Sequence, residues 1–149
     1  MEKQHIPLEQ PLKQFIDWEY NAGCIASDRI TVDGCKVGYM TRSEPLANGP
    51  DCGWRFWAGD EDDAYTDDTS HFAVFHTNTI CNYDPDIVPF LEAPCGSEFV
   101  RDEAAVAHFA PDNELAFAWL METNIDLLER VGEAAPKKPR GLFRGLFRS

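Results

Sequence analysis

The residues of this chain that are best suited to chemistry form one dense acidic run. Between residues 59 and 68 the sequence reads GDEDDAYTDD, so six of these ten positions carry a carboxylate and none carries a basic group. Like charges at such spacing repel one another, and the run is therefore expected to add little to the stability of the fold. This pattern predicts that something outside the fold uses the run.

Metal binding is the first chemistry that such a run suggests. A calcium-binding EF-hand loop needs a glycine at its sixth position and a bidentate glutamate at its twelfth. Counted from Asp60, these positions hold Tyr65 and His71, so the EF-hand pattern fails. An irregular site in which carboxylates are joined by His71 or His76 stays open. No metal or other cofactor is predicted.

Catalysis finds less support in the sequence. Two carboxylates with different pKa values can cleave a glycosidic bond if one is shielded in an apolar cleft, whereas a loop that opens with Gly59 is expected to be solvated. Cys24, Cys52 and Cys81 carry no local signature of an activated thiol. The sequence contains no phosphate-binding loop, dinucleotide fingerprint, nucleophile elbow or HExxH motif. The chain is therefore expected not to be an enzyme.

Protein recognition fits the run and its neighbours better. Aromatic side chains beside the run supply anchors for a contact, and the carboxylates supply a long-range field that attracts a basic surface. Tryptophans in a strand are usually core residues and a charge run is often only a solvated face, so both simpler interpretations remain. The candidate partner-binding residues are Trp54, Trp57, Asp60, Glu61, Asp62, Asp63, Tyr65, Asp67 and Asp68.

Strands on either side must position the acidic run. Residues 54–58 and 72–75 are largely apolar, which predicts two central strands covered on both faces and joined by the acidic loop at one edge of the structure.

An early β-hairpin is predicted from the dipeptide Asp33-Gly34, which is a favoured two-residue turn. The cross-strand pairs are then Val32 with Cys35 and Ile30 with Val37.

Helical segments complete the predicted domain. The spacing of apolar residues predicts amphipathic helices over 8–20 and 111–132, whereas two prolines within 78–91 favour short helical turns. A last short strand is expected at 96–100. These elements predict a single α+β domain over residues 1–133, with a mainly antiparallel sheet flanked by N- and C-terminal helices.

The charge balance limits the classes of partner. The formal net charge is −13, and five of the thirteen basic residues lie among the last thirteen positions, so the rest of the chain is more acidic still. Such a body repels nucleic acid and anionic membranes and attracts basic proteins. No apolar run is long enough to span a membrane and no secretory segment opens the sequence, which predicts a cytoplasmic protein. Five cysteines without a CxxC pair fit free thiols there.

Residues 134–149 form a basic tail beyond the predicted domain. The tetrapeptide Gly-Leu-Phe-Arg occurs at 141–144 and again at 145–148. This tail could dock on a partner, on an anionic membrane or on the acidic patch of the chain itself, or it could be a frayed, solubilising terminus.

Six ordered runs of the sequence form a series that covers roughly residues 22–102. They are CIASDRITVDG at 24–34, KVGYM at 36–40, GWRF at 53–56, GDEDD at 59–63, NTI at 78–80 and NYDP at 82–85. This series resembles the bacterial immunity-protein family numbered thirty-three, formerly catalogued as a domain of unknown function. Trp57 and Ala58 depart from it, because a smaller or less aromatic pair is expected there, and the basic tail is extra.

The resemblance implies an α+β domain of bacterial polymorphic toxin systems, in which an immunity protein binds a toxin and blocks it. We therefore predict a non-catalytic inhibitor that binds a cognate toxin with a basic surface. The alternative is a small cytoplasmic enzyme or metal-dependent protein that uses the acidic loop as ligands. A third hypothesis is a scaffold that binds a partner through its tail.

Overall fold

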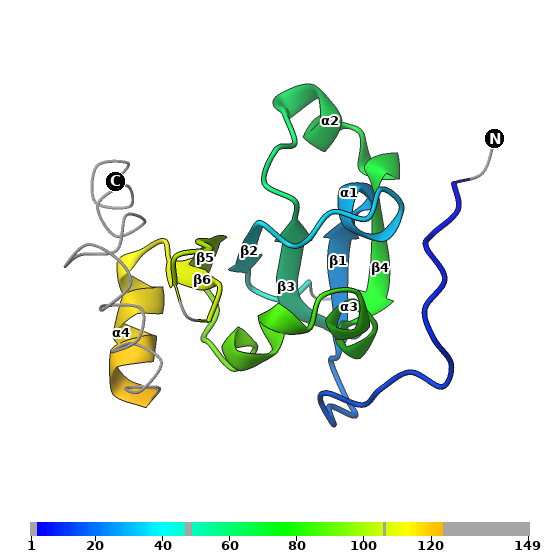
Figure 1. Cartoon of the computed structure of the whole chain (residues 1–149). Coiled ribbons are helices and arrows are strands. Elements are labelled where there is room, and N and C mark those ends of the chain that lie inside the picture. Colours follow the sequence, from blue (N-terminus) through cyan, green and yellow to red (C-terminus); the bar gives the residue numbers. More distant parts are fainter. Residues whose placement is uncertain (1–2, 47–48, 106, 124–149) are drawn as a thin grey trace.

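The computed structural model describes residues 3–46, 49–105 and 107–123, in which short strands and helices alternate along the chain (Figure 1). In chain order the elements are β1 (Gly23–Ser27), α1 (Asp28–Thr31), β2 (Tyr39–Arg42), β3 (Asp51–Trp57), α2 (Asp63–Asp67), η1 (Thr69–His71), β4 (Phe72–His76), α3 (Thr77–Tyr83), η2 (Pro85–Phe90), β5 (Glu98–Arg101), β6 (Phe109–Pro111) and α4 (Glu114–Thr123).

The strands form one sheet in the order β4-β1-β3-β2-β5-β6. β1 and β3 pair in parallel, and the other four neighbouring pairs are antiparallel. The predicted α+β class and mainly antiparallel sheet are therefore confirmed. β3 lies in the interior of the sheet, as its apolar sequence predicts.

β4 is an edge strand, so the prediction of a second central strand is wrong. Among the described residues, the backbone of β4 pairs only with β1. Val74, in the middle of β4, is 71% exposed. Only one face of β4 is well packed, because Phe75 contacts the core and the ring of His5. The acidic loop therefore runs from an interior strand to the edge, past the end of β1 (Figure 1).

The early hairpin is also wrong, because residues 28–31 form a turn of helix, α1. The hydroxyl of Ser27 caps this turn by accepting a hydrogen bond from the amide of Arg29 at 3.1 Å. Asp33-Gly34 follows the helix, and Gly34 has φ +83°, the left-handed conformation that ends many helices. The Asp-Gly signal therefore marks a helix end here. β2, which comes next, pairs with β3 and β5.

The helix predicted over 8–20 is absent, since the described residues before β1 contain no helix or strand. Side chains of α3 bind this segment's backbone. The Asn78 side-chain oxygen accepts from the amide of Phe15 at 2.7 Å, and the Asn82 side chain donates to the carbonyl of Lys13 at 2.9 Å. These bonds satisfy peptide groups that a helix would otherwise satisfy internally. Phe15 and Ile16 still pack against the core.

The remaining elements agree better with the sequence. The short helical turns at 78–91 are confirmed as α3 and η2, and the strand near 96–100 is confirmed as β5. β6, which has three residues, is not among the elements predicted from the sequence. α4 confirms the start of the C-terminal helix, whereas the rest of the predicted segment to residue 132 and the tail at 134–149 lie outside the described residues.

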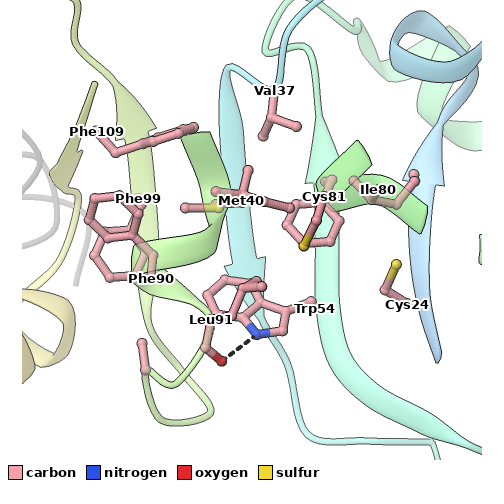
Figure 2. Packing of buried hydrophobic residues seen from close by; sticks show 14 of the residues in the cluster. Cys24, Val37, Met40, Trp54, Ile80, Cys81, Phe90, Leu91, Phe99 and Phe109 are labelled. Carbon is pink, nitrogen blue, oxygen red and sulfur yellow. Dashed lines mark hydrogen bonds between the residues drawn. The ribbon is translucent and has the colours of Figure 1, made fainter. Parts of the chain in front are cut away.

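The core lies on one face of the sheet, beneath α3 and η2 (Figure 2). Met40, Trp54 and Phe99 project into it from β2, β3 and β5, and each is fully buried. The indole N–H of Trp54 donates to the carbonyl oxygen of Leu91 at 3.0 Å, so its one polar atom is satisfied. Within the part of the chain that the structure describes, no helix has the length and apolar character to cross a membrane.

Candidate functional site

Several carboxylates of the acidic loop form hydrogen bonds that stabilise the loop's own structure. The sequence did not predict these bonds. Asp62 caps α2 by accepting from the amide of Tyr65 at 2.8 Å, and Asp68 caps η1 by accepting from the amide of Ser70 at 3.0 Å. The hydroxyl of Ser70 also donates to Asp68, and these bonds hold the pKa of Asp68 below its usual range. Each carboxylate satisfies an amide that the helix start leaves unpaired.

Glu61 organises the entry to the same loop. Its two carboxylate oxygens accept from the backbone amides of Ala58 and Gly59, both at 2.9 Å. This bidentate contact fixes the chain where it leaves β3. The expectation that the acidic run adds little to the fold is therefore wrong for Glu61, Asp62 and Asp68.

Asp60 has a basic partner that lies outside the acidic run. The guanidinium of Arg29, in α1, donates to both oxygens of Asp60 at 2.6 and 3.2 Å and also binds Asp33 at 3.0 Å. The hydrogen bond from Arg29 holds the pKa of Asp60 below its usual range. Fork-shaped contacts of this kind fix geometry as well as charge, so the loop is tied to α1.

Two carboxylates of the run remain available. Asp63 and Asp67 are exposed, and among the described residues neither accepts a hydrogen bond nor forms an ion pair through its side chain. They lie at the two ends of α2. These two charges are the part of the run that the fold does not use.

Tyr65 holds α2 against the start of β4. Its ring stacks on that of His71 with centroids 4.0 Å apart and meets the edge of Phe72. Burial raises the pKa of the Tyr65 hydroxyl. Tyr65 is therefore partly committed to the loop's own structure.

The two tryptophans of β3 lie on opposite faces of the sheet. Trp54 is 0% exposed in the core, which removes it from any surface that a partner can touch. Trp57 is half-buried on the other face, where its ring lies 5.5 Å from that of Tyr39. Only Trp57 can contact a partner directly.

Trp57, Asp60 and Glu61 line a pocket of about 830 Å³. Its floor is formed by Tyr39, Trp57 and Val100, because Tyr39 is the direct cross-strand partner of both other residues. The acidic loop forms one side. Tyr39 and Val100 were not predicted as site residues, since their proximity to Trp57 depends on strand pairing between distant parts of the sequence.

The described residues give little support to the metal and catalytic alternatives. Within that part of the chain, no three His, Cys, Asp or Glu side chains are grouped so as to hold a metal ion. His76 caps α3 through its ring nitrogen. Burial raises the pKa of the Cys81 thiol to about 12, and that of Cys24 still further, so both thiols stay protonated at neutral pH.

Comparison with known proteins identifies the family. The family model described as the Immunity protein Imm33 domain matches residues 24–108. The chain belongs to this family. No curated protein and no solved structure matches the chain.

Residues that carry the likeness to the Imm33 family build the scaffold of the site. Asp84 is 2% exposed and accepts from the amide of Val37 at 2.9 Å and from the guanidinium of Arg101 at 2.7 Å. Asn78 and Asn82 hold the N-terminal segment. The acidic loop lies within the matched residues, and so does the floor of the pocket.

Proposed function

We propose that this chain binds and neutralises a cognate bacterial toxin in the cytoplasm, without catalysis. The contact surface in this proposal consists of the exposed carboxylates of α2 and the pocket above Tyr39 and Trp57. Membership of the Imm33 family supports an immunity-type role. The observation that carries the choice of surface is the position of the aromatic pocket directly beside the acidic loop.

Charge supports a basic partner. The chain has a formal net charge of −13, and Asp63 and Asp67 are exposed without internal partners among the described residues. A concentrated acidic surface attracts a basic one before contact and raises the association rate. If the toxin acts on nucleic acid, its basic groove is a natural target, because the loop then presents carboxylates where phosphates would bind.

The pocket supports a specific contact after this attraction. A lysine or arginine side chain of the toxin fits the aromatic floor of this pocket. The lining also contains Asp60 and Glu61, whose carboxylates already bind Arg29 and backbone amides. Arg101 lines the pocket too, with its charge balanced by Asp84, Asp86 and Glu103. A cation over an aromatic face gains roughly 0.5–2 kcal/mol, more when the pair is shielded from water. Half-buried aromatic residues beside a charged rim are also typical of contact hot spots.

The proposal is tested by isolating the partner and measuring protection. The chain is used to retrieve its partner from a lysate of the bacterium that encodes it, and the toxin identified by mass spectrometry is then co-expressed with the chain. Asp63→Asn/Asp67→Asn and Trp57→Ala are compared with the wild type. We expect both variants to lose protection of growth and the first to slow association, because it weakens the attracting field.

A matched control separates local from general charge effects. Glu9→Gln/Glu44→Gln removes two exposed carboxylates elsewhere on the surface, and protection is expected to persist. Added salt should slow the association of wild type, since exposed charges are screened within about 8 Å at physiological ionic strength. Equal loss in the loop and control variants, or an association rate that salt does not change, would exclude this surface as the docking site.

A further inference from the structure

In the part of the chain that the structure describes, no strand lies beside the outer edge of β4. One side of β4 pairs with β1 over five consecutive residues, from Phe72 to His76. Successive residues of a strand direct their peptide groups to alternate sides, so part of the backbone of β4 points away from β1. Among the described residues, the amide of Phe72 donates to the carbonyl of Thr69 and His76 is the N-cap of α3, whereas no backbone group outside β1 forms a hydrogen bond with residues 73–75. β4 lies at one end of the sheet (Figure 1).

This edge lacks the features that usually prevent strands from pairing with other chains. Protected edges are short, bulged, or carry lysine or proline. β4 has the sequence FAVFH, pairs with β1 without a bulge, and presents Val74 at 71% exposure. The opposite edge, β6, has only three residues and ends in Pro111. The two edges of one sheet therefore differ in their capacity to accept a further strand.

We propose that β4 is a self-association site, at which a second copy of this chain adds its own β4 in antiparallel pairing. The two copies are then related by a two-fold axis near Val74, so that Val74 faces Val74 and Phe72 faces His76 of the other copy. A two-fold contact needs a self-complementary surface. β4 meets this condition because it carries no carboxylate, lysine or arginine.

The charge distribution favours this antiparallel arrangement. The acidic loop precedes β4 in the chain, so antiparallel pairing places the two loops at opposite ends of the new contact. A five-residue strand is about 17 Å long at roughly 3.4 Å per residue. This separation is about twice the screening length of roughly 8 Å at physiological ionic strength. Parallel pairing would instead bring the two acidic loops together.

The N-terminal segment, which the structure describes from Lys3 onward, forms no backbone hydrogen bond with this edge over those residues. Its contacts include the ring of Phe75 through His5, α1 through Ile6 and Thr31, and α3 through Asn78. Just before β4, Lys3 also donates to the carbonyl of Ser70 at 2.8 Å. Successive side chains of a strand point to opposite faces. Val74 therefore lies on the face away from these contacts, which agrees with its exposure while the segment is in place.

A shallow pocket extends the surface beyond the strand itself. It has a volume of about 560 Å³ and is lined in part by Tyr20, Val74 and His76. Tyr20 is 82% exposed, so two of the large exposed apolar residues lie at this pocket. A side chain of the second copy can enter it. The contact is nevertheless small beside a stable interface of about 1,200–2,000 Å², which predicts a weak dimer in exchange with monomer.

The test is sedimentation velocity of the full chain over a hundredfold range of concentration. We expect the average mass to rise from that of the monomer toward twice that value for the wild type, and Val74→Lys to stay monomeric. Met121→Lys is the matched control, since it also replaces an exposed apolar residue by lysine but lies on α4, at the other end of the molecule (Figure 1). It should behave as the wild type does.

Salt and amide exchange locate the contact. Because two acidic bodies repel each other, added salt should strengthen the dimer, which is opposite to its effect on binding of a basic toxin. Amides of residues 72–76 should exchange more slowly at high than at low concentration, and circular dichroism confirms that Val74→Lys is folded. A wild type that stays monomeric throughout, a Val74→Lys chain that dimerises equally, or unchanged exchange in β4 would each overturn the proposal.

Discussion

Trp54 and Trp57 lie on the same strand and have different surroundings. Trp54 is fully buried and donates its indole N–H to the carbonyl of Leu91, whereas Trp57 lies half-exposed on the other face against Tyr39. α3 and η2 cover the first face, and the second carries the pocket beside the acidic loop. One strand thus supplies both the core and the candidate site. Aromatic composition alone does not distinguish a core tryptophan from one at the candidate site. The direction in which each side chain points along the strand, and the face that the helices cover, decide this.

The acidic loop shows the same division among carboxylates. Glu61, Asp62 and Asp68 bind backbone amides of the loop, whereas Asp63 and Asp67 are exposed without a partner among the described residues. Residues that look alike in sequence therefore differ in what their removal should change. This contrast between residues that the fold uses and residues that it leaves available leads to the following predictions.

The largest effect is expected at the two tryptophans. Trp54→Ala should lower the free energy of unfolding by about 3–5 kcal/mol, because it leaves a cavity in a packed core. Trp57→Ala should cost about 1 kcal/mol, since only half-buried contacts with Tyr39 are lost. Urea unfolding followed by circular dichroism measures both. Similar losses for the two variants would show that the faces of β3 are equally important for stability.

A second effect concerns the ion pair between Asp51 and Arg55, which lies on the same face of β3 as Trp57. Arg55 donates to both oxygens of Asp51 at 2.8 and 2.9 Å, and together with the amides of Leu46 and Gly53 it holds the pKa of Asp51 well below its usual range, although burial acts in the opposite direction. Asp51→Asn should lower stability at neutral pH by about 1–3 kcal/mol, because the Arg55 side chain is only 13% exposed and loses its charged partner.

The pH dependence gives a sign to this prediction. Because the pKa of Asp51 is depressed in the folded state, its contribution is complete above the unfolded-state value of about 3.9 and is lost as the pH falls below it toward the folded-state value. As the pH falls through this acidic range, the free energy of unfolding should decrease less steeply for Asp51→Asn than for the wild type. Equal slopes for the two proteins would contradict this prediction.

A smaller effect should separate the carboxylates of α2. Asp62→Ala removes the cap of α2 and should cost about 1 kcal/mol. Asp67→Asn, at the other end of the same helix, should leave stability unchanged or slightly raise it, because a carboxylate is disfavoured at a helix C-terminus. Thermal unfolding distinguishes the two. A loss of stability in Asp67→Asn would show that the fold uses this residue after all.

The smallest effect is expected at Arg29. Arg29→Gln removes the ion pair between α1 and Asp60. The Arg29 side chain is 32% exposed and that of Asp60 is 58% exposed, so solvent screens the pair and global stability should barely change. The loop should become more mobile at its start. Backbone order parameters from NMR relaxation should fall at residues 59–61 and stay constant at 69–71, where Asp68 and Ser70 hold η1.

The sequence was informative where local chemistry decides the structure. Apolar composition located β3, and the prolines within 78–91 located the short helical turns. It failed where distant groups intervene. The side chains of Asn78 and Asn82 bind the backbone of residues 13–16, which prevents a helix there, and the cap at Ser27 turns the Asp33-Gly34 signal into a helix end.

The candidate site was only partly visible for the same reason. Trp57, Asp60 and Glu61 were predicted and lie together at the pocket. Tyr39 and Val100 join them through cross-strand pairing, and Arg29 is 31 residues from Asp60 in the chain. No local motif encodes such contacts. Trp54 is among the predicted residues because the sequence does not show which face of β3 the helices cover.

The bonds that hold the N-terminal segment set an order for folding during synthesis. Lys13 and Phe15 bind residues of α3 more than 60 positions later, and the carbonyl of Ile6 accepts from the Tyr83 hydroxyl across 77 positions. These twenty or so residues are synthesised before β1, yet their partners in α3 emerge only after β1 to β4 have been made. At roughly 5–20 residues per second, this segment stays without its partners for several seconds during synthesis and docks only once α3 has been made.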